Sequence, residues 1–143
     1  MRPEFREVSN SQEMEAAKSI RFRVFVDEQG VPPDIEMDEY DAEAVHVICK
    51  MGSVVVGTGR LVRMPDGMKL GRVAVLASHR RSGLGAGIVK WLIARALETG
   101  HETVYANVQI GARSFYENMG FNAVGEHFME ASIEHVKMLW EKP

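Results

Sequence analysis

The stretch Val73-Ala-Val-Leu-Ala-Ser-His-Arg-Arg-Ser-Gly-Leu-Gly-Ala-Gly87 runs from an apolar strand pattern through a basic, glycine-rich turn into a helix pattern. The first turn of a helix presents four unpaired backbone N–H groups, and its dipole adds about half a positive charge. Glycines let phosphate oxygens approach that backbone, and arginines add permanent charge in a fork geometry suited to phosphate. The residues concerned are Gly83, Gly85, Gly87, Arg80 and Arg81. We therefore predict an anion-binding site; the alternative is a helix start with closely packed glycines and two solvated arginines.

Two common phosphate-binding patterns do not match this turn. The P-loop needs Gly-x-x-x-x-Gly-Lys-Ser/Thr, and the nearby lysine, Lys90, is followed by Trp91. The dinucleotide pattern Gly-x-Gly-x-x-Gly requires a glycine where this chain has Ile88. The pattern that does match is Arg80-x-x-Gly83-x-Gly85, directly after an apolar strand.

This motif resembles the acyl-CoA pyrophosphate loop, Gln/Arg-x-x-Gly-x-Gly/Ala, of the GNAT superfamily of N-acetyltransferases. About 25 residues further on, Ser114-Phe-Tyr-Glu-Asn-Met-Gly-Phe121 is similar to the second hallmark of the family, a helix end with an aromatic residue, a tyrosine and, after three residues, Gly-Phe. The segments Arg21-Phe-Arg-Val-Phe-Val-Asp-Glu-Gln29 and Glu134-His-Val-Lys-Met138 resemble a branch of compact bacterial members that includes glyphosate N-acetyltransferase.

The hydrophobic periodicity along the chain mixes strand and helix patterns. We expect strands over residues 3–8, 45–51, 54–64, 68–77, 103–109, 121–129 and 133–141, and helices over residues 10–24, 83–99 and 112–119. The acidic stretch 30–44 is expected to be a loop or one short helix. This order predicts an α+β (mixed α/β) fold in a single domain over residues 1–143. The resemblance implies the GNAT fold, a mostly antiparallel central sheet that splays between its fourth and fifth strands and is flanked by helices.

Composition narrows the function classes. The chain has 143 residues, 45% of them hydrophobic and 26% charged, which argues against disorder. A net charge of −3 favours neither nucleic acid nor a membrane surface as partner, and no apolar run approaches the roughly 18 residues of a membrane span. The single cysteine, Cys49, allows no internal disulfide, which favours a reducing compartment. The first ten residues carry charges where a signal peptide needs an apolar stretch, so we expect a cytoplasmic protein. No residues have metal-ligand spacing, so we expect no metal.

The resemblance implies acetyl-CoA as cosubstrate and a pose for it. The strand backbone at residues 73–75 would bond the pantetheine arm in β-sheet fashion, and the amides of residues 81–86 would cradle the pyrophosphate. Asn107 would bond the arm from the other side of the slot between the two splayed strands. The implied coenzyme-binding residues are Val73, Ala74, Val75, Arg80, Arg81, Ser82, Gly83, Leu84, Gly85, Ala86 and Asn107.

Acyl transfer to an amine needs a group beside the departing thiolate. The resemblance implies Tyr116 in this role, because the acid of the family lies at this tyrosine. A phenol with a pKa of about 10 does not readily give its proton to a thiolate of about 8.5, so we expect a strengthening hydrogen bond rather than complete transfer. The alternative is that Tyr116 only packs beside Phe115.

A base must also remove the ammonium proton of the acceptor, and an imidazole with a pKa of about 6.5 suits this at neutral pH. Among the five histidines, the resemblance implies His135, because the glyphosate-acetylating relatives carry their base there. The alternative is a structural histidine on a half-buried strand. His46 alternates with an apolar strand face and is expected to be structural, although Glu28 and His46 are also candidates to line the acceptor pocket.

Two further residues bear on the acceptor. Arg72 matches an arginine of the phosphonate-binding relatives, whereas Gln109 stands where another arginine is expected, so we do not expect a doubly anionic acceptor. The acidic run between Asp34 and Glu43 is predicted to be a solvated loop or, alternatively, to attract a cationic amine.

Together these features predict an N-acetyltransferase that uses acetyl-CoA and a primary amine of a small molecule, with direct attack in a ternary complex. Two alternatives remain, a protein or peptide N-acetyltransferase and a catalytically idle CoA-binding regulatory module. Exposed strands near the C-terminus also make a homodimer an expectation.

Overall fold

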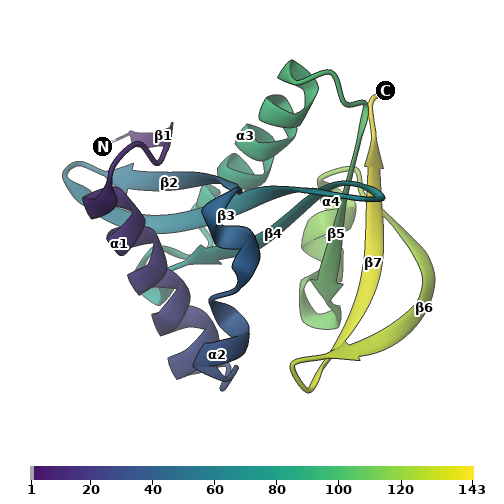
Figure 1. Cartoon of the computed structure of the whole chain (residues 1–143), viewed down its shortest axis with the longest axis horizontal. Coiled ribbons are helices and arrows are strands. Elements are labelled where there is room, and N and C mark those ends of the chain that lie inside the picture. Colours follow the sequence, from purple (N-terminus) through teal and green to yellow (C-terminus); the bar gives the residue numbers. More distant parts are fainter. Residues whose placement is uncertain (1) are drawn as a thin grey trace.

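A seven-stranded mixed sheet runs through the computed structural model, which describes residues 2–143 (Figure 1). Its strands are β1 (Pro3–Glu7), β2 (Val45–Met51), β3 (Val54–Met64), β4 (Gly67–Val75), β5 (Thr103–Gln109), β6 (Asn122–Glu130) and β7 (Ile133–Glu141). Their order across the sheet is β1-β2-β3-β4-β5-β7-β6, with β4 and β5 parallel and all other neighbours antiparallel. The predicted α+β fold is confirmed.

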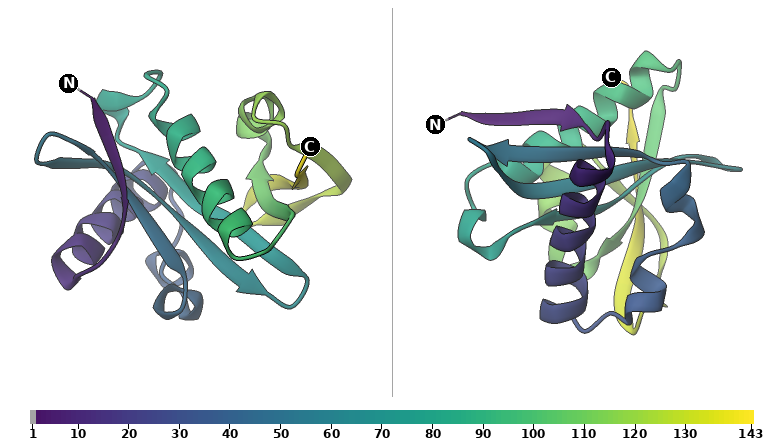
Figure 2. Two further views of the ribbon diagram at one scale, coloured as in Figure 1. Left: turned by 90° about the horizontal axis from the view of Figure 1, so that it is seen from above. Right: turned by 60° about the vertical axis from the view of Figure 1, so that its left-hand side comes forward.

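Helices cover both faces of the sheet (Figure 2). They are α1 (Ser11–Arg21), which continues as a π-helical segment (Phe22–Glu28), α2 (Pro33–Glu36), α3 (Leu84–Glu98) and α4 (Arg113–Asn118), with short 3-10 turns at Glu39–Ala42, Ala77–His79 and Ile110–Ala112. The acidic stretch expected to be a loop or one short helix thus holds two short helical turns. Within residues 2–143 no helix is long and apolar enough to cross a membrane.

The strand β4 contains a bulge that its sequence alternation did not predict. Arg72 adopts a left-handed conformation with φ of 52°, and the pairing register with β3 shifts there. Strict alternation had put Leu70 and Val75 on opposite faces, but the extra residue brings both into the core beneath α3. The bulge also turns the Arg72 side chain toward α2, where it bonds the backbone oxygen of Glu36.

The parallel strands β4 and β5 are paired over a very short length. They match only at Met68 with Val104 and at Lys69 with Tyr105, whereas β5 pairs with β7 along its whole length. Beyond Lys69 the two strands separate (Figure 1). The splay predicted between the fourth and fifth strands is therefore present, and it leaves one edge of each strand without a strand partner.

Close packing of α3 on the sheet depends on two glycines of β3. A Cβ atom on Gly57 would lie 2.9 Å from Cδ1 of Ile88, and one on Gly59 would lie 2.7 Å from Cγ2 of the same side chain. Ile88 is fully buried, so it has little freedom to move away. These glycines therefore set how closely the helix approaches the strands.

We predict that Gly57→Ala and Gly59→Ala each lower the free energy of unfolding by about 1–3 kcal/mol through overpacking. Ile88→Val removes Cδ1 but keeps Cγ2. In urea unfolding, Ile88→Val should therefore recover part of the loss in the Gly57→Ala background and none in the Gly59→Ala background. Equal coupling of Ile88→Val to both glycine variants would contradict this packing.

An ion-pair network, here called the arginine–carboxylate cluster, holds the 30–44 segment against the sheet. Its members are Arg21, Arg60, Arg72, Glu36, Asp38 and Asp41. The Arg21 Nε lies 2.9 Å from Oε1 of Glu36, and both side chains are almost completely buried. Burial alone raises the pKa of Asp41, but its hydrogen bonds with Arg21 and the nearby arginine charges outweigh this and hold that pKa well below its usual value. Half of the acidic run is therefore structural rather than solvated.

We predict that Asp41→Asn lowers the free energy of unfolding at pH 7 by about 3 kcal/mol, because it leaves buried arginine charge without its partner. Glu43→Gln, on an exposed residue of the same segment, is the matched control and should change little. Because the folded pKa of Asp41 is depressed, its stabilisation is complete above the ordinary value of 3.8 and is lost as the pH falls below it. The difference between wild type and Asp41→Asn should thus shrink in urea unfolding as the pH is lowered below about 4; a constant difference would contradict the assignment.

Candidate active site

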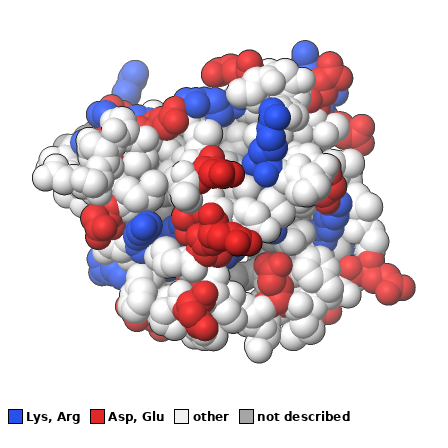
Figure 3. All heavy atoms as spheres, viewed as in Figure 1, with Lys and Arg blue, Asp and Glu red and all other residues white. Residues whose placement is uncertain are grey.

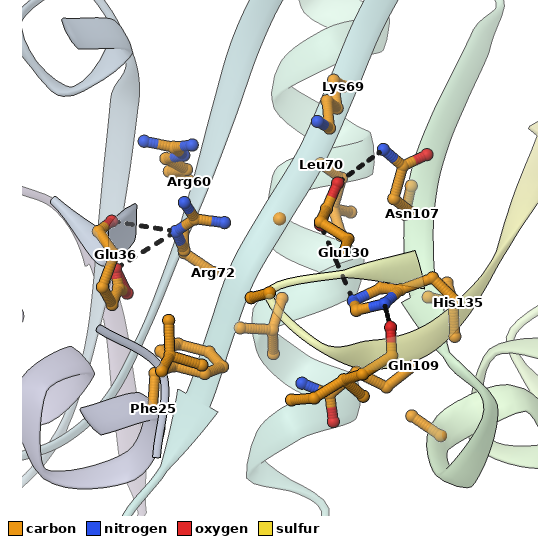
Figure 4. Close-up of a pocket in the computed structure, with 18 of the residues that line it drawn as sticks. Phe25, Glu36, Arg60, Lys69, Leu70, Arg72, Asn107, Gln109, Glu130 and His135 are labelled. Atoms are coloured by element: carbon orange, nitrogen blue, oxygen red, sulfur yellow. Dashed lines mark hydrogen bonds and ion pairs between the residues drawn. The ribbon is translucent and has the colours of Figure 1, made fainter. Parts of the chain in front are cut away.

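A cavity of about 460 Å³ lies where β4 and β5 separate, between the α2 region and the β6–β7 turn (Figure 4). Six of the residues that the sequence analysis proposed for the site line it. They are Arg72, Val73, Asn107, Gln109, Tyr116 and His135. The splayed sheet thus brings together groups from four separate segments of the chain.

The candidate acid, Tyr116, lies at the inner wall of this cavity. Tyr116 is only 8% exposed, and its ring lies edge-to-face between those of Phe115 and Phe121, at centroid distances of 5.0 and 5.2 Å. Among the described residues its hydroxyl has no hydrogen-bond partner, and burial raises the pKa of the phenol well above its usual value. The hydroxyl therefore stays protonated and is a donor that lacks an acceptor within the described chain.

The candidate base, His135, lies on β7 at the opposite wall and is 6% exposed. Its Nδ1 lies 2.7 Å from the backbone oxygen of Ile133, and its ring stacks on Phe128. Because a carbonyl oxygen only accepts, Nδ1 carries the hydrogen, and Nε2 of the neutral ring keeps a lone pair. The ring orientation and tautomer are therefore both fixed, as a base requires.

Glu130 is one of several cavity residues that the sequence analysis did not propose for the site. Its Oε2 lies 3.6 Å from Nε2 of His135, and Nδ2 of Asn107 lies 3.5 Å from its Oε1 (Figure 4). It precedes a two-residue turn, Ala131-Ser132, that reverses the chain into β7. Because the strand was expected to end at Met129, Glu130 was expected to lie in the turn. A prediction of a two-residue hairpin turn would have placed Glu130 opposite Ile133, beside His135.

The turn before α3 presents an uninterrupted row of free backbone amides. The N–H groups of residues 81–86 donate to no backbone or side-chain acceptor in the described chain, and Gly87 is the first whose amide is bonded, to the oxygen of Gly83. Gly83 has φ of 82° and ends the turn where the helix begins. This is the donor arrangement that an anion at a helix start requires.

The third glycine of the motif has a different role from the one expected. A Cβ atom on Gly87 would lie 2.3 Å from the ring of Phe5 on β1, so this glycine serves packing rather than phosphate approach. A Cβ atom on Gly85 would lie 3.5 Å from Phe115, which is ordinary contact, so this position would accept a methyl group without strain.

Arg80 and Glu28 bond to each other across the turn before α3. The Arg80 Nε donates to the oxygen of Val75 at 2.8 Å, and its two terminal nitrogens donate to the two carboxylate oxygens of Glu28 at 2.8 Å each. The hydrogen bond from Arg80 also holds the pKa of Glu28 below its usual value. Arg80 thus uses three of its five N–H donors to brace the turn, and Glu28, expected in the acceptor pocket, does not line the cavity.

His46 also lies outside the cavity, which fits the structural role expected for it better than a place in the acceptor pocket. The residue is 3% exposed, and its Nε2 donates to the backbone oxygen of Asp41 at 2.9 Å. Burial lowers its pKa. The sheet face that carries His46 is covered by α1 and the 30–44 segment, which sequence alternation did not reveal.

The other two acceptor candidates, Arg72 and Gln109, do line the cavity but are already bonded. Arg72 pairs with Glu36 and Asp38 at 3.2 Å each. The Nε2 of Gln109 donates to Oε1 of Gln29 at 2.7 Å, which joins β5 to the segment after α1. Within residues 2–143 there is no cluster of ligating side chains that could hold a metal ion.

Comparison with known proteins identifies the family. The family model described as an acetyltransferase (GNAT) domain matches residues 6–142. An uncharacterized N-acetyltransferase of Bacillus subtilis, YjcF, is 39% identical over 132 residues, covering 91% of this chain and 94% of that protein. The glyphosate-acetylating branch is not specified by these matches.

Two solved structures are similar over almost the whole chain. A putative N-acetyltransferase from Lactobacillus plantarum superposes with a TM-score of 0.90 at 23% identity, covering 99% of both chains. An acyl-CoA N-acyltransferase from Pseudomonas aeruginosa superposes with a TM-score of 0.84 at 25% identity, covering 97% of this chain and 98% of that one. With the family model and a close relative both matching nearly end to end, the chain belongs to the GNAT family of acyl-CoA-dependent N-acetyltransferases.

Proposed function

We propose that this protein transfers an acetyl group from acetyl-CoA to a primary amine of a small molecule, by direct attack in a ternary complex. The observation that carries the proposal is that one cavity, where β4 and β5 separate, is lined by both Tyr116 and His135. Within the described chain the Tyr116 hydroxyl has no hydrogen-bond partner, and the six backbone amides of residues 81–86, in the turn that follows β4, are free as well. Acetyl-CoA, when bound, supplies an acetyl group activated as a thioester.

The coenzyme is held in this proposal by backbone groups. The amides of residues 81–86 bond the pyrophosphate, helped by the charge of Arg81 and the dipole of α3. The free edge of β4 at Val73, Ala74 and Val75 bonds the pantetheine arm, and Asn107 lies across the slot from it. The lack of a strand partner for β4 beyond Lys69 supports this arrangement.

The chemistry is divided between the two walls of the cavity. His135 accepts a proton of the acceptor ammonium on Nε2, which makes the amine nucleophilic. Tyr116 donates a hydrogen bond to the sulfur as negative charge develops there; its raised pKa favours a hydrogen bond that strengthens over complete proton transfer.

The shape of the cavity supports a small acceptor over a peptide. Its volume of about 460 Å³ is in the range of small-molecule sites, and a hydrogen bond joins two of its lining residues, Gln29 and Gln109. A peptide acceptor or a catalytically idle CoA-binding module would be indicated instead if acetyl-CoA were consumed only with peptides, or with no amine at all, in a thiol-release screen.

Cys49 is buried and unpaired, which fits the reducing cytoplasm as the place of the reaction. The exposed edge strand β6 leaves a homodimer part of the proposal.

We predict that Tyr116→Phe and His135→Ala each lower turnover by roughly 10²–10⁴-fold, because each removes one proton-handling group. Affinity for acetyl-CoA should change little, since neither side chain holds the coenzyme in this proposal. Tyr105→Phe and His127→Ala are matched controls, because neither residue lines the cavity. Steady-state kinetics with calorimetry tests this, and wild-type turnover by either site variant would remove that residue from the chemistry.

We predict that Gly85→Glu weakens acetyl-CoA binding by at least about 100-fold, because a carboxylate would enter the amide row that receives the pyrophosphate. Gly85→Ala is the matched control and should bind nearly normally, since its Cβ makes only ordinary contact with Phe115. Calorimetric titration separates the two. Equal affinity of both variants and the wild type would contradict coenzyme binding at this turn.

A further inference from the structure

Most charged groups that line the cavity neutralise one another. Four of them, Glu36, Asp38, Arg60 and Arg72, belong to the arginine–carboxylate cluster. In that cluster three arginines pair with three carboxylates. The charged lining residues outside the cluster are Lys69 and Glu130. Within the described chain no lysine or arginine pairs with Glu130 and no carboxylate pairs with Lys69, so the cavity holds one negative and one positive charge outside the cluster.

The Glu130 carboxylate lies beside the candidate base His135, where it could bind a cation. The Glu130 side chain is 41% exposed, whereas that of His135, behind it, is 7% exposed. Figure 4 shows Glu130 between Asn107 and His135. A ligand that enters the cavity meets the carboxylate at the same place as Nε2.

The spacing between the two acceptor atoms leaves room for a third group. Oε2 of Glu130 and Nε2 of His135 are 3.6 Å apart, too far for a direct hydrogen bond. A nitrogen to one side of the pair can lie about 2.9 Å from each atom and donate to both. By contrast, Glu134 and His127 on the same hairpin make direct contact at 2.9 Å and lie outside the cavity.

The hairpin holds Glu130 firmly in this position. Ala131 and Ser132 both have left-handed φ angles, of 51° and 63°, in a two-residue turn that contains neither glycine nor asparagine. Such angles cost roughly 1 kcal/mol or more for a residue with a side chain. Strain kept beside a candidate site supports a positional role for the residue that the turn carries.

Exposed carboxylates on the surrounding surface favour the approach of a positively charged acceptor. Figure 3 shows acidic side chains in the middle of the face that is viewed in Figure 1. Exposed carboxylates of the 34–43 segment, outside the arginine–carboxylate cluster, include Asp34 and Glu39. Such charge raises the local concentration of cations near this face.

We propose that Glu130, held by a hydrogen bond from Asn107, forms with Nε2 of His135 a subsite for the ammonium group of the acceptor, and that Glu130 selects acceptors that are cationic at neutral pH over neutral ones. This inference rests on the proposed function. The ammonium donates one N–H to Glu130 and one to Nε2, and its first proton passes to Nε2, leaving a neutral amine beside the imidazolium. As the C–N bond forms and the C–S bond breaks, the second proton leaves with the sulfur as thiol, and His135 returns the first to water.

The test is the kinetics of Glu130→Gln with two amines of similar shape, benzylamine, which is cationic at neutral pH, and aniline, which is neutral. The variant keeps the size of the side chain and removes its charge. We expect the KM for benzylamine to rise roughly 10- to 100-fold, with kcat within about threefold and the KM values for aniline and acetyl-CoA unchanged. Glu134→Gln, which removes the other histidine-paired carboxylate of the hairpin, should behave as wild type. An unchanged KM for benzylamine, or an equal rise for aniline, would overturn the subsite.

A binding measurement separates this inference from the proposed function. The affinity of the protein for benzylamine, measured by calorimetry without acetyl-CoA, should fall in Glu130→Gln and not in Glu134→Gln. If wild type binds benzylamine through Glu130 but consumes no acetyl-CoA, the subsite stands and the proposed function fails. If wild type acetylates benzylamine and Glu130→Gln does so with the same KM, the function stands and the subsite fails.

Discussion

The separation of β4 from β5 after only two paired positions is the constraint on which the rest of the site depends. In a continuous sheet the edges of these strands would be joined by hydrogen bonds, and no slot would exist. Because β5 beyond Tyr105 pairs only with β7, the β4 edge at residues 71–73 faces a cavity instead of a strand. The same separation allows Tyr116 from α4 and His135 from β7 to face one space.

Two supports keep the separated strands from closing. On one side, the arginine–carboxylate cluster fastens the 30–44 segment to β3 and β4, so that α2 forms a fixed wall. On the other, the tight β6–β7 turn carries Glu130 to the opposite wall. Both walls are polar groups in fixed positions, which is what a site needs in order to orient an acceptor without rearranging.

Sequence reasoning was successful where a local pattern determines local structure. Strands β2, β3, β5 and β7 begin and end where alternation predicted, and α3 begins at the glycine turn. The turn itself was identified because an anion site at a helix start requires glycines and donors that are neighbours in sequence. His135 and Tyr116 came from a family resemblance rather than from any periodicity, and their meeting at one cavity depends on the tertiary fold.

Contacts between distant segments are what the sequence patterns could not predict. Glu28 and Arg80 are 52 residues apart and bond to each other, so neither pattern alone could indicate the pair. The bulge at Arg72 reverses the facing of half a strand, and the packing of Phe5 against Gly87 explains a glycine assigned to phosphate. Glu130 was overlooked because a shift of one residue in a hairpin end decides whether a side chain belongs to a loop or to the site.

Amide hydrogen exchange followed by NMR, with and without coenzyme A, tests the central claim most directly. The free amides of residues 81–86 should exchange rapidly in the protein alone and become strongly protected when the coenzyme binds, together with amides on the β4 edge at residues 73–75. The β2 amides, already within the sheet, serve as an internal reference. Calorimetrically saturated protein whose amides 81–86 still exchange as fast as before would contradict the account.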